Sequence, residues 1–395
     1  GGGVHPRMLR SATHGNSKRA PFAEPADAVE FARRTQPRFP TVPVLLGPAS
    51  SLLAQAVDGV AGVTVDPDDP DRLIATGALP SPRDAAESAA GLDGAPFEAL
   101  REFCRSYAEP GLMSDSAQVV TAADVDVRTA VDVAVDVDRA VLRGAAATAV
   151  ISGAATARPA AVRIPVLGPV TLALALRAAG HDAEEVDLVA ASLVAARSVA
   201  LARFVRTHMS QAGDPVLAVV MSEPGLVGSM HPTFRLLPAA VRSLLDPVVD
   251  ALDRSTSSDS LLIGVHVPGP CDWPTVIGSG ASLLCVPVDR SIAGWAPLFG
   301  DLLDRGGRIC WGAVRVDRPM GTSTDPHWRS LVALWTSLVV EGVDPMALRL
   351  RSTFSPAGGL EAFDPAQAQT ILEITEGVAE RVGHQALAAR LSLGA

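Results

Sequence analysis

An α/β fold of the TIM (β/α)8 barrel type, with an N-terminal extension, is the fold class that the sequence predicts. From residue 161 onward, short apolar runs rich in β-branched residues alternate with helical stretches. This alternation is typical of a parallel sheet covered by helices. Six such β–α units follow one another, and one or two earlier strands would bring the count close to eight. An open doubly wound sheet is the alternative, although no G-x-G-x-x-G or P-loop motif follows any strand.

The N-terminal half is less regular than the rest of the chain. We expect residues 1–25 to form an arm and residues 26–395 to form a single barrel domain. Residues 37–48 hold four prolines and are expected to be extended. Helices are predicted over 26–36, 49–60, 82–108 and 121–149, with an acidic turn at 66–71. The V-D-V alternation within 121–149 also suits a strand, but its alanines and its length favour a helix.

The C-terminal half supplies the six β–α units. Strands are predicted over 161–169, 215–224, 261–266, 282–288, 308–314 and 348–353. Helices are predicted over 170–180, 184–212, 234–254, 272–279, 295–305, 326–342 and 364–390. In a barrel, the carboxyl ends of all these strands face one mouth, where barrel enzymes hold their chemistry.

Composition limits the classes of partner. The formal net charge is −10, so polyanionic partners such as nucleic acids or anionic membranes would be repelled on average. No apolar run approaches the roughly 20 residues that a membrane span needs. The four cysteines lie far apart with no C-x-x-C motif, which predicts a reducing cytoplasm rather than a disulfide framework. We expect a small-molecule ligand, with a partner protein as a further possibility.

The order of short motifs at the strand ends carries a resemblance to a known family. The motifs are G-P-V-T-L-A (168–173), M-S-E-P-G-L (221–226), V-H-V-P-G (265–269), D-R-S (289–291), I-C-W-G-A-V (309–314) and S-P-A-G-G-L (355–360). In this order they resemble the C-terminal barrel of cobalamin-independent methionine synthase, within the superfamily that includes uroporphyrinogen decarboxylase. T-H-G-N-S-K-R-A-P-F (13–22) resembles the family's opening strand end. The resemblance covers most of the chain.

The resemblance implies thiol alkylation on zinc, but this sequence departs from the family's ligand set. In the family, a histidine, a glutamate and two cysteines bind a zinc ion that holds the substrate thiol as its nucleophilic thiolate. His266 matches the histidine, whereas Pro268, Pro287 and Gly358 stand at the other three ligand positions. Zinc sites in proteins use at least three protein ligands. The resemblance therefore implies a degenerate zinc site, and we expect no zinc or other cofactor.

The same resemblance indicates candidate site residues. The family's Asp-Glu-Pro is Ser222-Glu223-Pro224 here, Asp317 stands where the family has a histidine, and Asn16 or Ser17 matches its opening serine. We therefore expect catalytic roles for three residues and substrate-binding roles for four. The catalytic candidates are His266, Glu223 and Asp317, and the substrate-binding candidates are Asn16, Ser17, Ser222 and Trp311.

Plainer interpretations of these residues stay open. His266 could be a strand-end histidine without a role, and Glu223 could form a salt bridge with Arg163 or Arg315. Trp311 suits packing of the barrel better than a pocket wall. Cys285 and Cys310 lie inside strands, where cysteine usually packs as a small hydrophobe. A rebuilt metal site of His266, Cys271 and Cys285 is the least favoured alternative.

Three functions fit the sequence. The first is a methyl- or alkyltransferase-like barrel that has lost its zinc shell and acts on, or binds, a small molecule without metal. The second is a metal-free decarboxylase-like lyase, for which Arg163, Arg315 and Asp317 are the candidate residues. The third is a non-catalytic relative that binds a small molecule or a partner protein. Fold alone does not choose among them.

Overall fold

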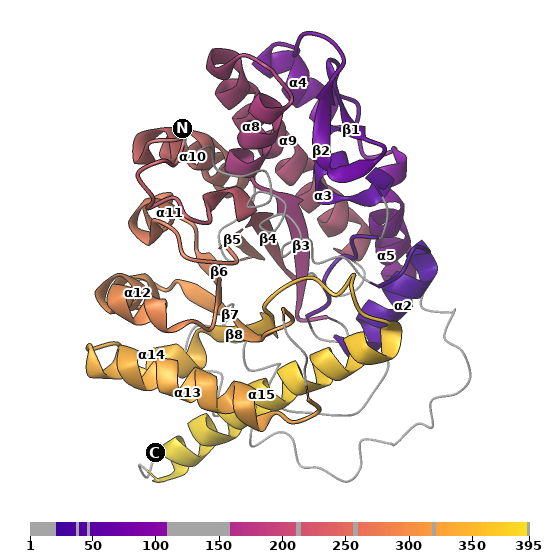
Figure 1. Ribbon diagram of the computed structural model, residues 1–395. Helices are drawn as coiled ribbons and strands as arrows, with labels where there is room; N and C mark the ends of the chain where they lie inside the picture. Colours follow the sequence, from indigo (N-terminus) through magenta and orange to yellow (C-terminus); the bar gives the residue numbers. More distant parts are fainter. Residues whose placement is uncertain are drawn as a thin grey trace.

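The computed structural model describes residues 21–36, 39–45, 48–108, 159–210, 215–255, 260–317 and 321–392. Its centre is a six-stranded parallel sheet whose strands lie side by side in chain order (Figure 1). The strands are β3 (Ala161–Leu167), β4 (Val216–Ser222), β5 (Leu261–His266), β6 (Leu283–Pro287), β7 (Arg308–Val314) and β8 (Ser352–Pro356). A doubly wound sheet reverses its strand order at a switch point. This sheet has no such reversal, so the doubly wound alternative is wrong.

The sheet curls as a half-barrel, and an extended segment continues it beyond β3. Thr41 forms a parallel bridge with Arg163. The amide of Arg163 donates to the carbonyl of Pro40 at 2.9 Å, and the amide of Val42 donates to the carbonyl of Arg163 at 2.8 Å. In the described residues the main sheet thus has six strands and this bridge, rather than the complete eight-stranded barrel that the sequence predicts.

Helices follow the strands in alternation. They are α8 (Pro169–Ala178), α9 (Ala183–Met209), α10 (Pro238–Ser255), α11 (Trp273–Gly278), α12 (Ala296–Asp304), α13 (Asp325–Val340), α14 (Pro345–Leu350) and α15 (Pro365–Ser392), with 3-10 turns η5 (Pro224–Leu226) and η7 (Arg290–Trp295). Proline lies in the first turn of α8, α11 and α14, where its missing N–H costs nothing. Asp272 and Asp344 cap α11 and α14 by accepting hydrogen bonds from backbone amides.

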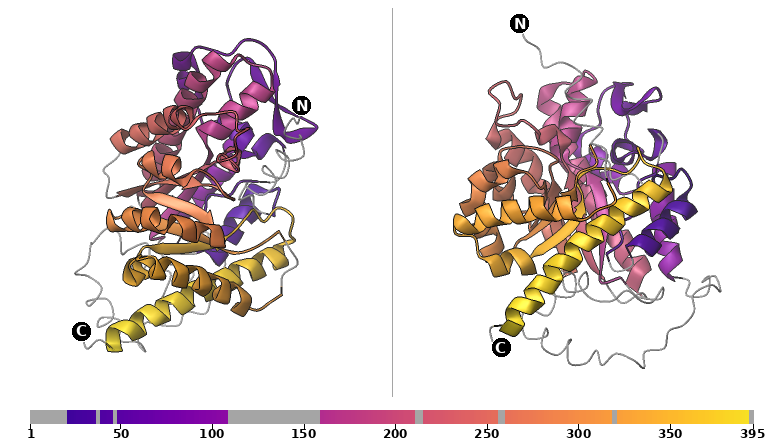
Figure 2. Two further views of the ribbon diagram at one scale, coloured as in Figure 1. Left: turned by 60° about the vertical axis from the view of Figure 1, so that its left-hand side comes forward. Right: turned by 60° about the horizontal axis from the view of Figure 1, so that its bottom comes forward.

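The N-terminal elements pack beside the first strands of the sheet. They are α2 (Pro25–Thr35), η1 (Pro48–Ser50), α3 (Leu52–Val57), β1 (Val63–Asp66), β2 (Asp69–Ala75), α4 (Pro82–Ala89), η2 (Ala95–Phe97) and α5 (Glu98–Ala108). Strands β1 and β2 form an antiparallel hairpin outside the main sheet. Helix α2 contacts α5 and the first turns of the C-terminal α15, where Phe31 packs against Ala368 and Leu372 (Figure 2).

The two faces of the sheet bury different side chains. Successive residues of a strand point to opposite faces. On β4, Leu217, Val219 and Met221 join the large core that the helices cover. Ala218 and Val220 belong instead to a small cluster with Leu283, Cys285 and Cys310. We call the face that carries this small cluster the inner face.

Most elements lie where the sequence predicts them, and the differences have local causes. The acidic stretch 66–71 includes the hairpin turn, but its flanking strands β1 and β2 were not predicted. Residues 348–350, predicted as strand, close helix α14 because Asp344 caps that helix, and β8 starts later, at Ser352. The predicted helix 121–149 lies outside the described residues.

Helix α9 contradicts the expectation that no segment reaches membrane-spanning length and hydropathy. Its Glu185–Met209 stretch of 25 residues contains an 18-residue window of mean hydropathy 1.7, of which 56% is buried within the protein. The helix packs against α4, α8, α10 and strands β3 and β4. Small residues such as alanine make it apolar on most sides, as expected of a helix buried in a protein core.

Candidate functional site

Ser222 and His266 come together at the carboxyl edge of the sheet. They end β4 and β5 and are register partners in the parallel pairing of these strands. Alternation places Ser222 on the inner face with Ala218 and Val220, and His266 on the same face two residues after Gly264. Their exposed fractions are 4% and 5%. The structure thus places a hydroxyl and an imidazole side by side on the inner face, at the edge where the family resemblance puts its chemistry.

Glu223, the next residue, is fully buried against the start of helix α8. One carboxylate oxygen accepts the amide hydrogen of Val170 at 2.9 Å, and the other accepts from the amide and hydroxyl of Thr171 at 2.7 and 2.6 Å. An acidic group at a helix N-terminus satisfies amides that have no partner within the helix and interacts favourably with the helix dipole. The two oxygens are engaged by α8 rather than by Arg163 or Arg315.

This contact depends on a glycine. A Cβ atom added to Gly168 would lie 2.2 Å from Cδ of Glu223, so only glycine lets the carboxylate reach α8. Burial raises the pKa of Glu223 from its usual 4.5 to about 7, although the hydrogen bonds from Thr171 and Val170 oppose the shift. Glu223 therefore has a clear structural role in joining the end of β4 to α8, and its catalytic role stays a prediction.

Asp317 lies beyond the end of β7 in an exposed ion pair. Its two carboxylate oxygens accept from Nε and Nη2 of Arg315 at 3.0 and 2.5 Å. Asp289, which follows β6, accepts hydrogen bonds from Ser291, and these bonds together with the nearby Arg315 lower its pKa. The edge therefore carries a small charged group of Arg315, Asp289 and Asp317, and none of these contacts tests the predicted catalytic role of Asp317.

Trp311 points away from the inner face. Its indole N–H donates to Oγ of Ser352 at 2.8 Å, and its ring makes an edge contact with Trp335 of α13. The side chain is fully buried between the sheet and the helices. The geometry agrees with the packing interpretation, and the substrate-binding role of Trp311 stays a prediction. Asn16 and Ser17 lie outside the described residues.

The four positions that the sequence resemblance aligns with zinc ligands lie at the same edge of the sheet. His266 and Pro287 end β5 and β6, Pro268 lies two residues past β5, and Gly358 lies two residues past β8. Only the first of these four carries a donor side chain. Within the described ranges, no group of three or more histidine, cysteine or acidic side chains is arranged to hold a metal ion.

The sequence did not predict a cluster of Arg163, Cys285 and Cys310, which lies on the inner face beside His266, the register partner of Cys285. The guanidinium of Arg163 on β3 contacts Sγ of Cys285 at 3.5 Å and Sγ of Cys310 at 3.8 Å. Arg163 is only 6% exposed, and its Nε has no hydrogen-bond partner among the described residues. The available signal was an arginine in the middle of an otherwise apolar strand. This signal could not show that the side chain of Arg163, on β3, reaches thiols on β6 and β7.

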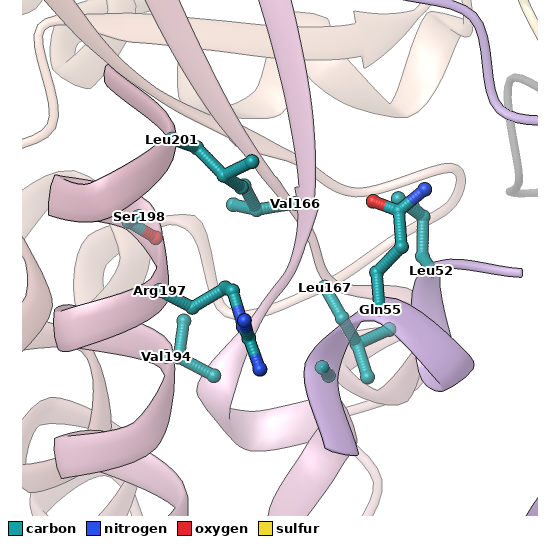
Figure 3. Close-up of a pocket in the computed structure, with 9 residues that line it drawn as sticks. Leu52, Gln55, Val166, Leu167, Val194, Arg197, Ser198 and Leu201 are labelled. Atoms are coloured by element: carbon teal, nitrogen blue, oxygen red, sulfur yellow. The ribbon is translucent and has the colours of Figure 1, made fainter. Parts of the chain in front are cut away.

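A small cavity lies on the opposite side of β3 from this cluster, between α3 and α9 (Figure 3). Its volume of about 10 Å³ admits no more than a water-sized molecule. Arg197 and Ser198 line it, and Nε of Arg197 and Oγ of Ser198 are buried without a hydrogen-bond partner in the described structure. The cavity suits a single buried water and is too small for a substrate.

Comparisons with known proteins assign no family to the chain. No family model matches the chain, and no curated protein matches it by sequence. Among solved structures, one match is a provisionally assigned vitamin-B12 independent methionine synthase from Listeria monocytogenes. The match has 10% sequence identity and a TM-score of 0.45, and it covers 98% of this chain and 95% of the other. At these values the match carries no argument about substrate or reaction.

Proposed function

We propose that this chain is a methionine-synthase-like barrel that binds, or acts on, a small molecule at the carboxyl edge of its sheet without zinc. The pairing of Ser222 with His266 on the inner face supports this proposal. Both side chains lie where ligands of barrel enzymes bind. Together they offer a hydroxyl and an imidazole that can orient a polar ligand. The replaced ligand positions Pro268, Pro287 and Gly358 support a mouth that works without metal.

A non-catalytic binding protein is the second candidate, and the position of Glu223 favours it. This carboxylate is fully buried and engaged by helix α8, so the mouth gains little acid–base capacity from it. Ligand binding would then depend on Ser222 and His266, and turnover would be absent. A cytoplasmic location, expected from the cysteine usage, is compatible with both candidates.

Thermal-shift measurements with homocysteine, a folate, a corrinoid and a porphyrin test the proposal. A ligand that binds only the native state stabilises it, by about 2.7 kcal/mol at one hundred times its Kd. We expect at least one of these compounds to raise Tm, and His266→Ala to abolish the rise. His231→Ala is the matched control, because His231 is exposed and bonded to Thr233. A rise that survives His266→Ala would refute the proposed site.

A further inference from the structure

We propose that Cys285 and Cys310 form a redox-active dithiol, held by Arg163, that a hydroperoxide converts into an intramolecular disulfide. The proposal does not rest on the proposed function, although Cys285 is the register partner of His266 as well as of Cys310. It assigns a modification site to a cluster that adjoins the ligand site on the inner face.

The pairing of the strands brings the two thiols together. Cys285 on β6 and Cys310 on β7 are direct register partners, and both belong to the inner-face cluster. Neighbouring strands lie roughly 4.8 Å apart. Disulfides join residues whose Cα atoms are roughly 4.4–6.8 Å apart. Two inward-facing register partners therefore have a spacing that a disulfide can bridge without moving either strand.

The buried guanidinium of Arg163 is the reason to expect reactivity from the thiols of Cys285 and Cys310. A buried guanidinium needs a compensating anion, because an unpaired charge in the interior is costly. No carboxylate of the described residues lies within salt-bridge distance of Arg163, and its terminal nitrogens contact the two sulfur atoms. A neighbouring cation favours the thiolate, which is the nucleophilic form of cysteine.

The contacts distinguish the roles of the two thiols. Sγ of Cys285 is the closer to the guanidinium, at 3.5 Å, whereas Sγ of Cys310 donates to Oγ of Ser355 at 3.5 Å. Cys285 is therefore the nucleophile, held as thiolate by Arg163, and Cys310 is the resolving thiol, which keeps its proton.

The reaction balances with one hydroperoxide. The Cys285 thiolate attacks one peroxide oxygen, so that an S–O bond forms, the O–O bond breaks and hydroxide leaves, which gives a sulfenic acid. The Cys310 sulfur then attacks the Cys285 sulfur, an S–S bond forms, and the S–O bond breaks as a second hydroxide leaves. The Cys310 proton and one solvent proton convert the two hydroxides into water. Two sulfur atoms are oxidised and the peroxide is reduced.

The other two cysteines are internal references. Cys104 and Cys271 are as buried as the pair, with exposed fractions of 1% and 0%. Burial raises the pKa of Cys104 to about 12, and burial together with Asp272 raises the pKa of Cys271 further. Burial alone therefore predicts that the thiols of Cys104 and Cys271 are inert. Cys285 and Cys310 differ from them because the guanidinium of Arg163 contacts both sulfur atoms.

Peptide mass spectrometry tests the proposal on the whole chain. The reduced protein is treated with a small molar excess of hydrogen peroxide, alkylated in denaturant and digested without reduction. We expect a cross-link between the peptides of Cys285 and Cys310, with Cys104 and Cys271 alkylated. In Cys310→Ser, we expect Cys285 to stop at a sulfenic acid that dimedone traps.

Removal of the cation provides the second measurement. Arg163→Met should slow the cross-link about tenfold or more, because less thiolate is present. Arg163→Lys should retain part of the rate, and Arg203→Met, on the exposed side of α9, should retain all of it. Native near-ultraviolet circular dichroism identifies any variant that fails to fold. Two results would overturn the proposal: equal oxidation of all four cysteines, or a cross-link that forms only in unfolding concentrations of urea.

Discussion

Single residues at the end of β4 show how neighbouring positions take different roles. Ser222 points to the inner face, whereas Glu223 turns towards helix α8 and is buried there. A sequence pattern could place both at a strand end but could not show the turn. The position of Gly168, whose missing side chain admits the carboxylate, decides this outcome. The pairing of Glu223 with an arginine was a reasonable expectation from charge alone, but two backbone amides and a hydroxyl take the place of the arginine.

The raised pKa of Glu223 predicts a pH dependence of stability. In the unfolded chain this carboxyl loses its proton near pH 4.5, whereas in the folded protein it keeps the proton up to about pH 7. Between these pH values the folded state binds more protons than the unfolded state. The contribution of Glu223 to the free energy of unfolding is therefore full below pH 4.5 and is lost as the pH rises to about 7. The contribution is on the order of 3 kcal/mol.

Urea unfolding at several pH values measures this effect. We expect the advantage of the wild type over Glu223→Gln to shrink between pH 4.5 and 7. Glu341→Gln, at an exposed helix end, should show no such trend. A constant difference between wild type and Glu223→Gln across this range would show that Glu223 is ionised throughout.

Among the elements, α9 depends most clearly on one polar anchor. Nη2 of Arg197 donates to the carbonyl of Asp58 at 2.7 Å, and Nη1 donates to the carbonyl of Gly91. The guanidinium also lies 4.9 Å from the centroid of the Phe97 ring. Desolvation by burial lowers the pKa of Arg197 to about 10, so the side chain stays charged at neutral pH. It joins α9 to the loops that follow α3 and α4.

Arg197→Met should destabilise the protein by about 2–4 kcal/mol, because it removes a charged donor from two partly buried hydrogen bonds to backbone carbonyls. Arg203→Met, on the exposed side of the same helix, should change the free energy of unfolding by less than about 0.5 kcal/mol. Chemical unfolding of the two variants makes the comparison. Equal effects would mean that the anchor adds nothing beyond helix propensity.

The sequence patterns predict which helices and strands are present better than they predict the residues at which each one begins and ends. Apolar β-branched runs such as Leu261–His266 are unambiguous because buried parallel strands need no alternation. The β1–β2 hairpin was missed because three aspartates and two prolines make up Asp66–Pro70 and conceal the short strands beside them. Long-range contacts could not be predicted either, and Arg163 with Cys285 and Cys310 is the clearest case.

At the scale of the whole molecule, consecutive parallel strands bring the candidate residues to one edge. The sequence could predict that strand ends share an edge, and Ser222 and His266 confirm it for two of the candidates. It could not predict that Glu223 would turn away, because this side chain owes its direction to helix α8, whereas Trp311 lies on the outer face by alternation with Cys310. Of the four positions at this edge that the sequence resemblance aligns with zinc ligands, His266 alone carries a donor side chain.

The zinc content of the purified protein is the most direct test of a mouth that works without metal. The protein is incubated with excess zinc, desalted without chelator and measured by inductively coupled plasma mass spectrometry, with His266→Ala alongside. One histidine among four ligand positions cannot hold zinc tightly, so we predict far less than one zinc per chain and no difference between the two proteins. One zinc per chain in the wild type that disappears in His266→Ala would contradict the account.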